Sequence, residues 1–366
     1  MPYKSRWALS PPATSIPSFM FGSPSASINS IDKLVIDAKR PETHYLTLHG
    51  YREWSKRLAA GLVASGLQHG DRVMLLSGNN IFNPIVIMGA IMAGGIYNSA
   101  NPAYTPRELS HQLRDSDPRF ILAADNCIDR ALEAADLVGM DRKRIFLFTE
   151  LPMDPESALQ NHASGHTNHH WSTLFSSSQI GRRFVWEELN SPNLARTTAI
   201  LIYSSGTTGL PKGVELSHSN IVANMLQLKQ IQLSDGGVEV RRGLCAVPLY
   251  HALGLVYYAF TAPKWGIPTY LMEQYNLTDM LSHIQRFDIT ELVLVPPMLV
   301  AMAKHPSVRD GTYNISGVRK VVAGAAPIGM EVTQQFEELW NRKLKVRQAW
   351  GMSEYGPQLQ ILIRRC

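Results

Sequence analysis

The stretch YSSGTTGLPKGVELSH, residues Tyr203 to His218, decides how the rest of the sequence is interpreted. Its glycines let the backbone turn so that several N–H groups face one point. Two serines and two threonines precede Lys212, and Pro211 stiffens the turn before that lysine. The apolar run AILIY, which leads into the stretch, predicts a buried strand that ends at this loop. A flexible linker needs none of these features, so the sequence predicts a phosphate-binding loop.

The loop differs from the phosphate loop of P-loop NTPases. That motif reads Gly-x-x-x-x-Gly-Lys followed by Ser or Thr, and its helix begins directly after the lysine. Here Gly206 and Gly209 are three residues apart, and Lys212 is followed by Gly213. The hydroxyl side chains also come before the lysine rather than after it. The spacing therefore predicts a phosphate loop of another class.

Composition narrows the class of protein. The chain has 366 residues, of which 45% are apolar and 18% charged, enough for two domains or two large subdomains. Its net charge of +5 is scattered, without a basic stripe that contains aromatic residues, which argues against nucleic-acid binding. Three cysteines without metal-type spacing predict a reducing compartment.

Two apolar segments bear on targeting. The N-terminus lacks the uninterrupted apolar core of a signal peptide, and the run from Pro84 to Ile96 is too short to cross a bilayer. We therefore expect a soluble intracellular protein without a transmembrane segment. The sequence does not indicate an oligomeric state.

Residues 1–30 are rich in proline and serine and are expected to form an irregular arm. Alternating helix and strand patterns over 31–190 predict a first α/β subdomain, in which 84–96 is a buried helix with close backbone contacts. Its residues 151–180 are polar and are expected to be a loop or insertion. The spacing of His162, His166, His169 and His170 could chelate a metal, but a solvated loop is favoured because no carboxylate or cysteine joins them.

A second α/β subdomain, containing the phosphate loop, is predicted for residues 191–356. Strand patterns begin near 197, 244, 290, 319 and 344, with helices between them. Strands that alternate with helices are typical of mostly parallel sheets. Residues 357–366 form an atypical tail.

Several further stretches carry a family resemblance, in this order: GNNIFNPIVIMGAIMAGGIYNSANPAYTPRELSHQL, VPLYHALGL, VVAGAAPIG and QAWGMSE. Together with the phosphate loop they resemble the adenylate-forming (AMP-binding) ligase superfamily. The sequence pattern of residues 20–356 is most similar to that of fungal 4-coumarate:CoA ligase-like acyl-CoA synthetases. The resemblance implies an α/β fold, namely the large N-terminal domain of these ligases, with stacked α/β subdomains and mostly parallel sheets.

The resemblance also implies a two-step reaction. A carboxylate attacks the α-phosphorus of Mg-ATP to give an acyl-adenylate and pyrophosphate, and the thiol of CoA then displaces AMP. The implied partners are a small carboxylic acid, ATP and CoA, with Mg²⁺ as the metal. Fungal secondary metabolism or fatty-acid metabolism is the implied context.

Site residues follow from the matching motifs. The implied catalytic residues are Lys212, His251 and Glu354. Glu354 and Thr208 are the implied Mg²⁺ ligands, since this hard cation prefers oxygen. Ser353 replaces the usual threonine and keeps a hydroxyl for the α-phosphate. The implied nucleotide-binding set is Ser204, Ser205, Gly206, Thr207, Thr208, Gly209, Lys212, Gly324, Ala325, Ala326, Gln348, Trp350 and Ser353.

The resemblance also implies an acyl pocket. Its implied lining is His251, Leu253, Val322, Ala325, Ala349, Gly351 and Met352. Small and aliphatic side chains predict an apolar acid: medium-chain fatty, aryl or arylpropenoic. Taken alone, His251 would more often be a core histidine, and Leu253 stands where hydroxycinnamate enzymes often carry tyrosine. The sequence does not indicate which acid is used.

The chain departs from the family after Glu354. The ribose-binding aspartate, the hinge and the catalytic lysine of the C-terminal domain have no counterpart here, so the sequence is interpreted as C-terminally truncated. Two alternatives to an active ligase stay open: an inactive remnant that retains at most ATP binding, and an adenylation domain of the peptide synthetase type. Relatives are cytoplasmic or peroxisomal, and this C-terminus carries no peroxisomal tag.

Overall fold

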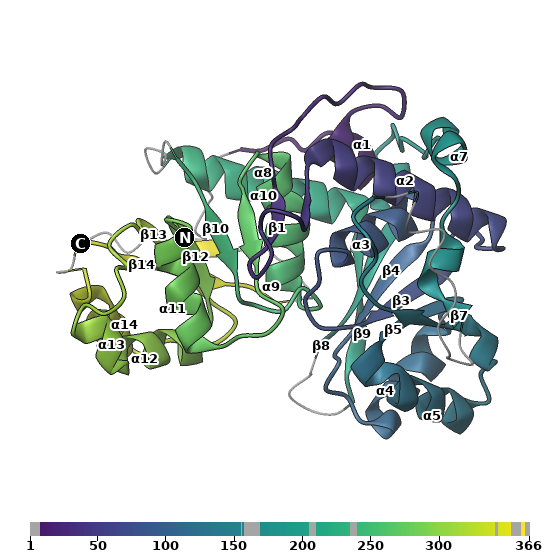
Figure 1. The fold of residues 1–366 in the computed structure, drawn as a ribbon. Helices are drawn as coiled ribbons and strands as arrows, with labels where there is room; N and C mark the ends of the chain where they lie inside the picture. The colour runs from purple at the N-terminus through teal and green to yellow at the C-terminus, as the bar shows by residue number, and fades with distance from the viewer. Residues whose placement is uncertain are drawn as a thin grey trace, which may run out of the picture.

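Two mixed sheets lie side by side, as Figure 1 shows, and α8 (His218–Ser234) runs alongside both. The computed structural model describes residues 8–154, 156, 169–204, 210–234, 240–340, 343–352 and 360–362. Most strand pairs in both sheets are parallel, and helices connect them. The predicted α/β class with mostly parallel sheets is confirmed.

The first sheet has seven strands. In spatial order they are β7 (His169–His170), β6 (Ile145–Phe148), β5 (Phe120–Ala124), β3 (Arg72–Leu76), β4 (Ile96–Ala100), β8 (Thr198–Ser204) and β9 (Lys212–Ser217). Only the last pair, β8 with β9, is antiparallel among the pairs described in this sheet. These strands form because their sequences are short apolar runs, which suits a sheet that is covered on both faces.

Both faces of the seven-stranded sheet are covered by helices. Met74 and Leu76 of β3 face α4 (Pro106–Ser116) and α5 (Ile128–Val138), whereas Val73 and Leu75 join the core that contains α2 (Leu48–Ala64) and α3 (Asn83–Met92). This alternation follows from the two-residue period of a strand. α3 is fully buried, and a Cβ at Gly89 would lie 2.9 Å from the Leu58 side chain. The predicted close backbone contact of this helix is confirmed.

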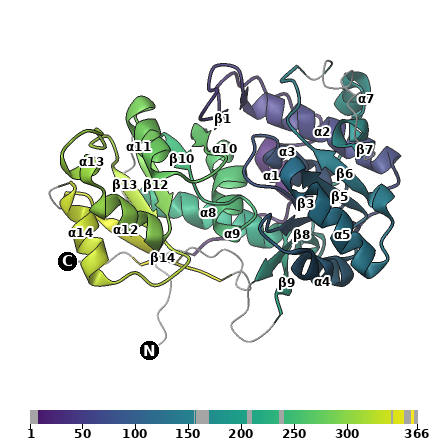
Figure 2. The ribbon, with the colours of Figure 1, turned by 60° about the horizontal axis from the view of Figure 1, so that its bottom comes forward.

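The second sheet has eight strands. In spatial order they are β15 (Gln360–Leu362), β14 (Val346–Trp350), β13 (Lys320–Ala323), β12 (Glu291–Leu294), β10 (Gly243–Cys245), β11 (Thr269–Leu271), β1 (Val35–Asp37) and β2 (Tyr45–Leu46). The strands from β14 to β1 are all parallel, and an antiparallel strand lies at each end. Figure 2 shows the C-terminal helices gathered beside these strands, away from the seven-stranded sheet.

The remaining helices are short or connect the strands of the second sheet. They are α1 (Ile16–Phe21), α7 (Ser178–Arg183), α9 (Ala252–Gly254), α10 (Ala262–Lys264), α11 (Leu277–Arg286), α12 (Pro296–Lys304), α13 (Pro306–Arg309) and α14 (Met330–Glu338). A π-helix, η5 (Leu255–Thr261), joins α9 to α10. Four 3₁₀ turns complete the described elements: η1 (Asp125–Cys127), η2 (Arg142–Arg144), η3 (Trp171–Leu174) and η4 (Leu194–Arg196).

Sheet membership does not change at residue 190, where the sequence suggested a boundary. β8 and β9 lie beyond that residue yet belong to the seven-stranded sheet, and β1 and β2 precede it yet belong to the eight-stranded sheet. Within 151–180, residues 169–175 also belong to the fold, because β7 pairs with β6 and Trp171 is fully buried against Phe148. Their aromatic side chains are scattered among polar residues, which hides this role in the sequence.

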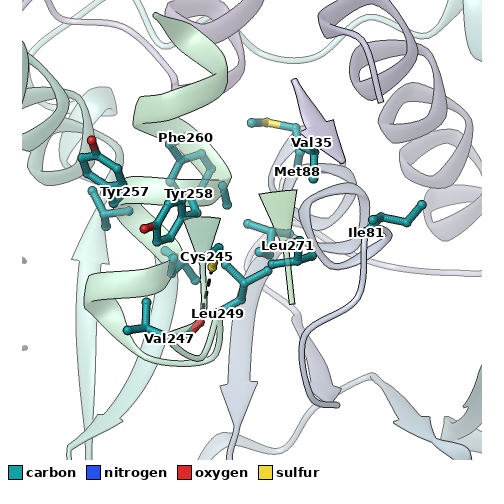
Figure 3. Packing of buried hydrophobic residues seen from close by; sticks show 14 of the residues in the cluster. Val35, Ile81, Met88, Cys245, Val247, Leu249, Tyr257, Tyr258, Phe260 and Leu271 are labelled. Carbon is teal, nitrogen blue, oxygen red and sulfur yellow. Dashed lines mark hydrogen bonds between the residues drawn. The ribbon is translucent and has the colours of Figure 1, made fainter. Parts of the chain in front are cut away.

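One apolar core joins the two sheets. Figure 3 shows Cys245 and Leu271 of neighbouring strands, with Tyr258 of η5 on one side and Met88 of α3 nearby. Cys245 and Cys127 are both buried free thiols. Among the described residues no helix has an apolar stretch long enough to cross a bilayer.

Candidate functional site

The phosphate loop connects the two strands of an antiparallel hairpin. β8 ends at Ser204, β9 begins at Lys212, and these two residues are paired. Lys212 is exposed on the protein surface. Most of the predicted loop lies outside the described residues, namely Ser205, Gly206, Thr207, Thr208 and Gly209. The expected strand before the loop is confirmed, and the lysine after it begins a strand rather than a helix.

Helix α4 contacts the hairpin on both sides of the loop. The Tyr203 hydroxyl donates a hydrogen bond to the Asp115 carboxylate (2.5 Å), and the His111 Nε2 lies 3.1 Å from the Pro211 carbonyl oxygen. His111 and Asp115 are four residues apart, so they share one face of the helix. A Cβ at Gly213 would lie 3.3 Å from the Tyr203 ring, so glycine lets that ring pack against β9. Sequence reasoning missed these two residues of α4, although their helical spacing was visible.

Three other predicted segments follow strands β10, β13 and β14 of the eight-stranded sheet. β14, β13, β12 and β10 are adjacent and parallel, so their carboxyl ends meet at one edge. The segment with His251 follows β10, Gly324–Pro327 follow β13, and Gly351 and Met352 follow β14. Ligands of open α/β sheets bind at the carboxyl edge of the strands. The structure therefore brings these three predicted segments to the edge where a ligand is expected.

The Gly324–Pro327 segment is shaped by its neighbour β14. Gly324 is buried, and a Cβ there would lie only 2.9 Å from the Ala349 carbonyl oxygen. Ala325 has φ 71°, a left-handed backbone conformation that is costly for a residue other than glycine. Ala325 and Ala326 are exposed. Such a strained, flat and exposed turn leaves room for a planar group to lie against the backbone.

β14 carries the next predicted residues. Gln348 is paired with Ala323 of β13, and both Gln348 and Ala349 are half-buried. Trp350 and Met352 are large apolar side chains that are 48% and 41% exposed, and Gly351 is exposed as well. Ser353 and Glu354 lie outside the described residues. Tryptophan side chains are usually mostly buried, so an exposed one beside the alanine turn offers an aromatic face to a ligand.

The predicted metal ligands, Thr208 and Glu354, both lie outside the described residues. Among the residues that are described, no group of three or more histidine, cysteine, aspartate or glutamate side chains could hold a metal. His169 and His170 belong to this described part, whereas His162 and His166 do not.

His251 lies at the start of α9 and packs on the Tyr250 ring, with ring centroids 4.5 Å apart. The imidazole has an exposed side, while its partial burial lowers its pKa below the usual range. It is therefore neutral at pH 7 and can accept a proton or a hydrogen bond. Gly254 lets α9 approach the preceding loop, because a Cβ there would lie 2.1 Å from the Pro248 carbonyl oxygen.

A buried amide from the other sheet positions the loop before His251. Asn79, which follows β3, donates hydrogen bonds from its Nδ2 to the carbonyl oxygens of Val247 (3.0 Å) and Met272 (3.1 Å). Its Oδ1 accepts from the Leu249 N–H (2.8 Å). These three bonds join the first sheet to two loops of the second sheet. Sequence reasoning did not single out Asn79, and nothing local to it marks this role.

Two residues predicted for the acyl pocket line a small cavity of about 10 Å³. They are Leu253 and Val322, from α9 and β13. The other lining residues are Leu228, Gln232, Tyr257, Val293 and Lys320. The predicted pocket residues Ala325, Ala349, Gly351 and Met352 do not line this cavity and lie toward the sheet edge.

Comparisons with known proteins agree with this geometry. The sequence model of the family described as AMP-binding enzyme matches residues 28–365, which includes most of the tail after residue 356. The chain is 32% identical over 302 residues to a phenylacetyl-CoA ligase of Aspergillus niger, covering 82% of this chain and 53% of the relative. It is 30% identical over 309 residues to 4-coumarate–CoA ligase 3 of Arabidopsis thaliana, covering 84% and 50%.

Solved structures show the same fold. The luciferase-like enzyme of the mealworm Zophobas morio superposes with a TM-score of 0.77 at 19% identity, over 95% of this chain and 74% of that one. A long-chain-fatty-acid–CoA ligase of Archaeoglobus fulgidus gives a TM-score of 0.75 at 22% identity, over 95% and 66%. The chain spans about half the length of the curated relatives it matches.

Proposed function

Because the chain belongs to the AMP-binding enzyme family, we propose that it binds ATP and a carboxylic acid as the activating part of an acyl- or aryl-CoA ligase. The acid carboxylate attacks the α-phosphorus of ATP, which forms an acyl-adenylate and releases pyrophosphate. The CoA thiol then attacks the acyl carbon and releases AMP. Fungal secondary or fatty-acid metabolism is the proposed setting.

One observation carries this proposal: the carboxyl ends of four adjacent parallel strands bring His251, the Gly324–Pro327 turn and Trp350 to one edge of a sheet. Each of these groups suits a different part of the reactants. A flat alanine turn and an aromatic face suit adenine, and a neutral imidazole suits the region of the reacting carboxylate. A cluster of unrelated core residues would not be exposed together at this edge.

The hairpin loop is the proposed site of the β- and γ-phosphates. Backbone N–H groups of a glycine-rich turn and the Lys212 ammonium would offset the phosphate charge. Since α4 contacts the hairpin on both sides of the loop, the loop is anchored where it meets the sheet. Ser204, Ser205, Gly206, Thr207, Thr208 and Gly209 are proposed to complete this set.

Further roles rest on the motif positions. We assign Gly324, Ala325, Ala326, Gln348 and Trp350 to adenine, and Ser353 to the α-phosphate. Glu354 and Thr208 would supply the oxygen atoms that Mg²⁺ prefers, and the bound metal would supply positive charge that offsets the phosphate charge. His251 and Leu253 are assigned to the mouth of the acyl pocket, and Val322 to its interior wall. These apolar walls favour an acid with an apolar body.

Acid-dependent exchange of pyrophosphate into ATP tests the proposal. It would be measured with fatty, aryl and arylpropenoic acids, in the 366-residue chain and in the longest protein that its gene encodes. We expect exchange that depends on the added acid and is lost in Lys212→Ala. Saturable ATP binding without exchange in either protein would instead support the remnant that only binds nucleotide. The absence of both exchange and ATP binding in both proteins would overturn the proposal.

A further inference from the structure

One face of the eight-stranded sheet carries a charged cluster beside the small cavity that Leu253 and Val322 line. Glu291 of β12 is paired with Lys320 of β13, and Val293 with Val322. Paired residues of neighbouring strands project from the same face, as do residues two apart along a strand. All four therefore share one face, and three of them line the cavity together with Tyr257 of η5 and residues of α8 and α9.

Most of the polar groups in this cluster have partners within the chain. Arg241 binds the Glu291 carboxylate with two nitrogen atoms, at 2.5 and 2.6 Å. The Tyr257 hydroxyl donates to the same carboxylate (2.9 Å), and the Gln232 side-chain oxygen accepts from Arg241 (2.7 Å). One negative charge is thus matched by one positive charge, and the aligned two-point contact makes this a strong pair.

Lys320 is the second cation of the cluster, and no described residue gives its ammonium group a hydrogen bond or an ion pair. Burial lowers the pKa of this ammonium group, the nearby Glu291 raises it, and Arg241 lowers it again. Lys320 is half-buried, so its ammonium group has less water around it than a surface lysine has, and a nearby anion would stabilise its charge. The chain therefore holds one positive charge without a partner among the described residues, beside a mainly apolar cavity.

The position of Lys320 along β13 places this charge away from the sheet edge. Lys320 is the first residue of β13, and Gly324 follows the last. Four residues of strand correspond to roughly 13 Å. Val322 lies between these two positions and lines the cavity, as do Leu253 and Val293. A ligand whose reacting carboxylate lies at the edge would thus meet apolar walls first and Lys320 last.

Resting on the proposed function, we infer that the activated acid carries a second carboxylate at its far end, which pairs with Lys320. An uncharged hydroxyl could accept a hydrogen bond from the ammonium group but would leave its charge unmatched. The substrate class is therefore a medium-length dicarboxylic acid with an apolar middle. The cavity has room for about one water-sized group, so the half-buried Leu253 side chain must shift as the acid enters.

Binding of matched acids to the 366-residue chain tests this inference without needing turnover. Octanedioate is compared with octanoate, and 4-carboxycinnamate with cinnamate and 4-coumarate, by isothermal titration calorimetry. The variants are Lys320→Met, Lys320→Gln, which retains a polar side chain should the first fail to fold, and Lys304→Met. Lys304 is an exposed lysine at the end of α12 and serves as the matched control.

We expect each diacid to bind about tenfold more tightly than its monoacid in the unmodified chain and in Lys304→Met. The ratio should fall to about one in both Lys320 variants. Equal binding of the two acids, stronger binding of 4-coumarate than of 4-carboxycinnamate, or a ratio that persists without Lys320 would overturn the inference. Monoacids that bind while diacids have no advantage would leave the proposed function intact. If no acid binds or supports exchange, the proposed function fails as well.

Discussion

Two hollows in this molecule differ in size and in chemistry. The larger one, about 340 Å³, lies where strands of both sheets end and is lined by five charged residues: Asp37, Lys39, Arg40, Glu150 and Glu273. Each of these has an oppositely charged partner within the hollow, at 2.5 to 2.8 Å. The smaller one, about 10 Å³, contains the unmatched Lys320. By size alone, the first hollow would be the candidate ligand site. The charge without a partner among the described residues instead favours the second hollow as the ligand site.

Asn79 also lines the larger hollow, and its side chain makes three hydrogen bonds to backbone groups of the chain. We assign groups of this kind to the stability of the fold, and we assign Lys320, which lines a cavity and has no partner among the described residues, to a ligand. The following predictions test this distinction, from the largest expected effect to the smallest.

Asn79→Ala should cause the largest loss of stability. It leaves the buried Met272 carbonyl oxygen and the Leu249 N–H without partners, and leaves the Val247 carbonyl oxygen with only the weak Cys245 thiol donor (3.4 Å). Each unpartnered group costs about 1–3 kcal/mol. We expect the free energy of unfolding in urea to fall by about 4 kcal/mol.

Asn80→Ala, at the neighbouring position that also lines the hollow, is the control; it removes one hydrogen bond, which the Asn80 Oδ1 accepts from the Phe82 N–H (2.8 Å), and should lower the free energy of unfolding by only about 1 kcal/mol. Similar losses in both variants would mean that Asn79 does not join the sheets.

His218 should make stability depend on pH. Its Nδ1 accepts a hydrogen bond from the Ile16 N–H (3.0 Å), and burial lowers its pKa to about 4 from an ordinary value of 6.5. Between these values the unfolded chain binds a proton that the folded chain does not, so stability falls as the pH drops below 6.5. The loss from pH 8 to pH 5 should be about 2 kcal/mol.

His218→Gln retains an acceptor that does not titrate, so the urea unfolding of this variant should lose that part of the pH dependence. His49→Gln, an exposed histidine, is the control. If the pH dependence is the same in all three proteins, His218 is not the titrating group.

Lys320→Met should have the smallest effect on stability, and in the opposite direction. Because the ammonium group has no partner among the described residues, its removal leaves nothing unpaired, and we expect a gain of at most about 1 kcal/mol. Arg241→Met is the contrasting variant. It removes the cation that pairs with Glu291, so its loss of stability should be several-fold larger than any change in Lys320→Met. Thermal unfolding of both variants gives the comparison. A large loss of stability in Lys320→Met would mean that this lysine, like Asn79, stabilises the fold.

Much of this fold could be predicted from the sequence, because short apolar runs and the Thr105 capping box mark strands and helices locally. Long-range pairing could not. β1 is three residues long and pairs with β11, more than 200 residues away, so no local pattern shows which sheet it joins. Trp171 was missed for a related reason, since two of its aromatic partners, Phe82 and Phe148, are distant in the sequence.

The site shows the same limit. Motif spacing identified the loop, the alanine turn and His251, whose roles stay proposals. It could not identify Lys320, because a lysine at the start of an apolar strand normally faces solvent. Only the register with Glu291 places it on the face of the sheet beside the cavity. Under our proposal, the predicted apolar pocket would have a charged end.

The most direct test of the central claim, that this chain binds ATP through the hairpin loop, is calorimetric titration with Mg-ATP. The 366-residue chain would be compared with Lys212→Ala and with Lys143→Ala, an exposed lysine before β6, which lies next to the strand at the opposite edge of the same sheet. We predict saturable binding that Lys143→Ala leaves unchanged and Lys212→Ala weakens by about tenfold or more. Equal affinities in all three proteins, or no saturable binding, would contradict the account.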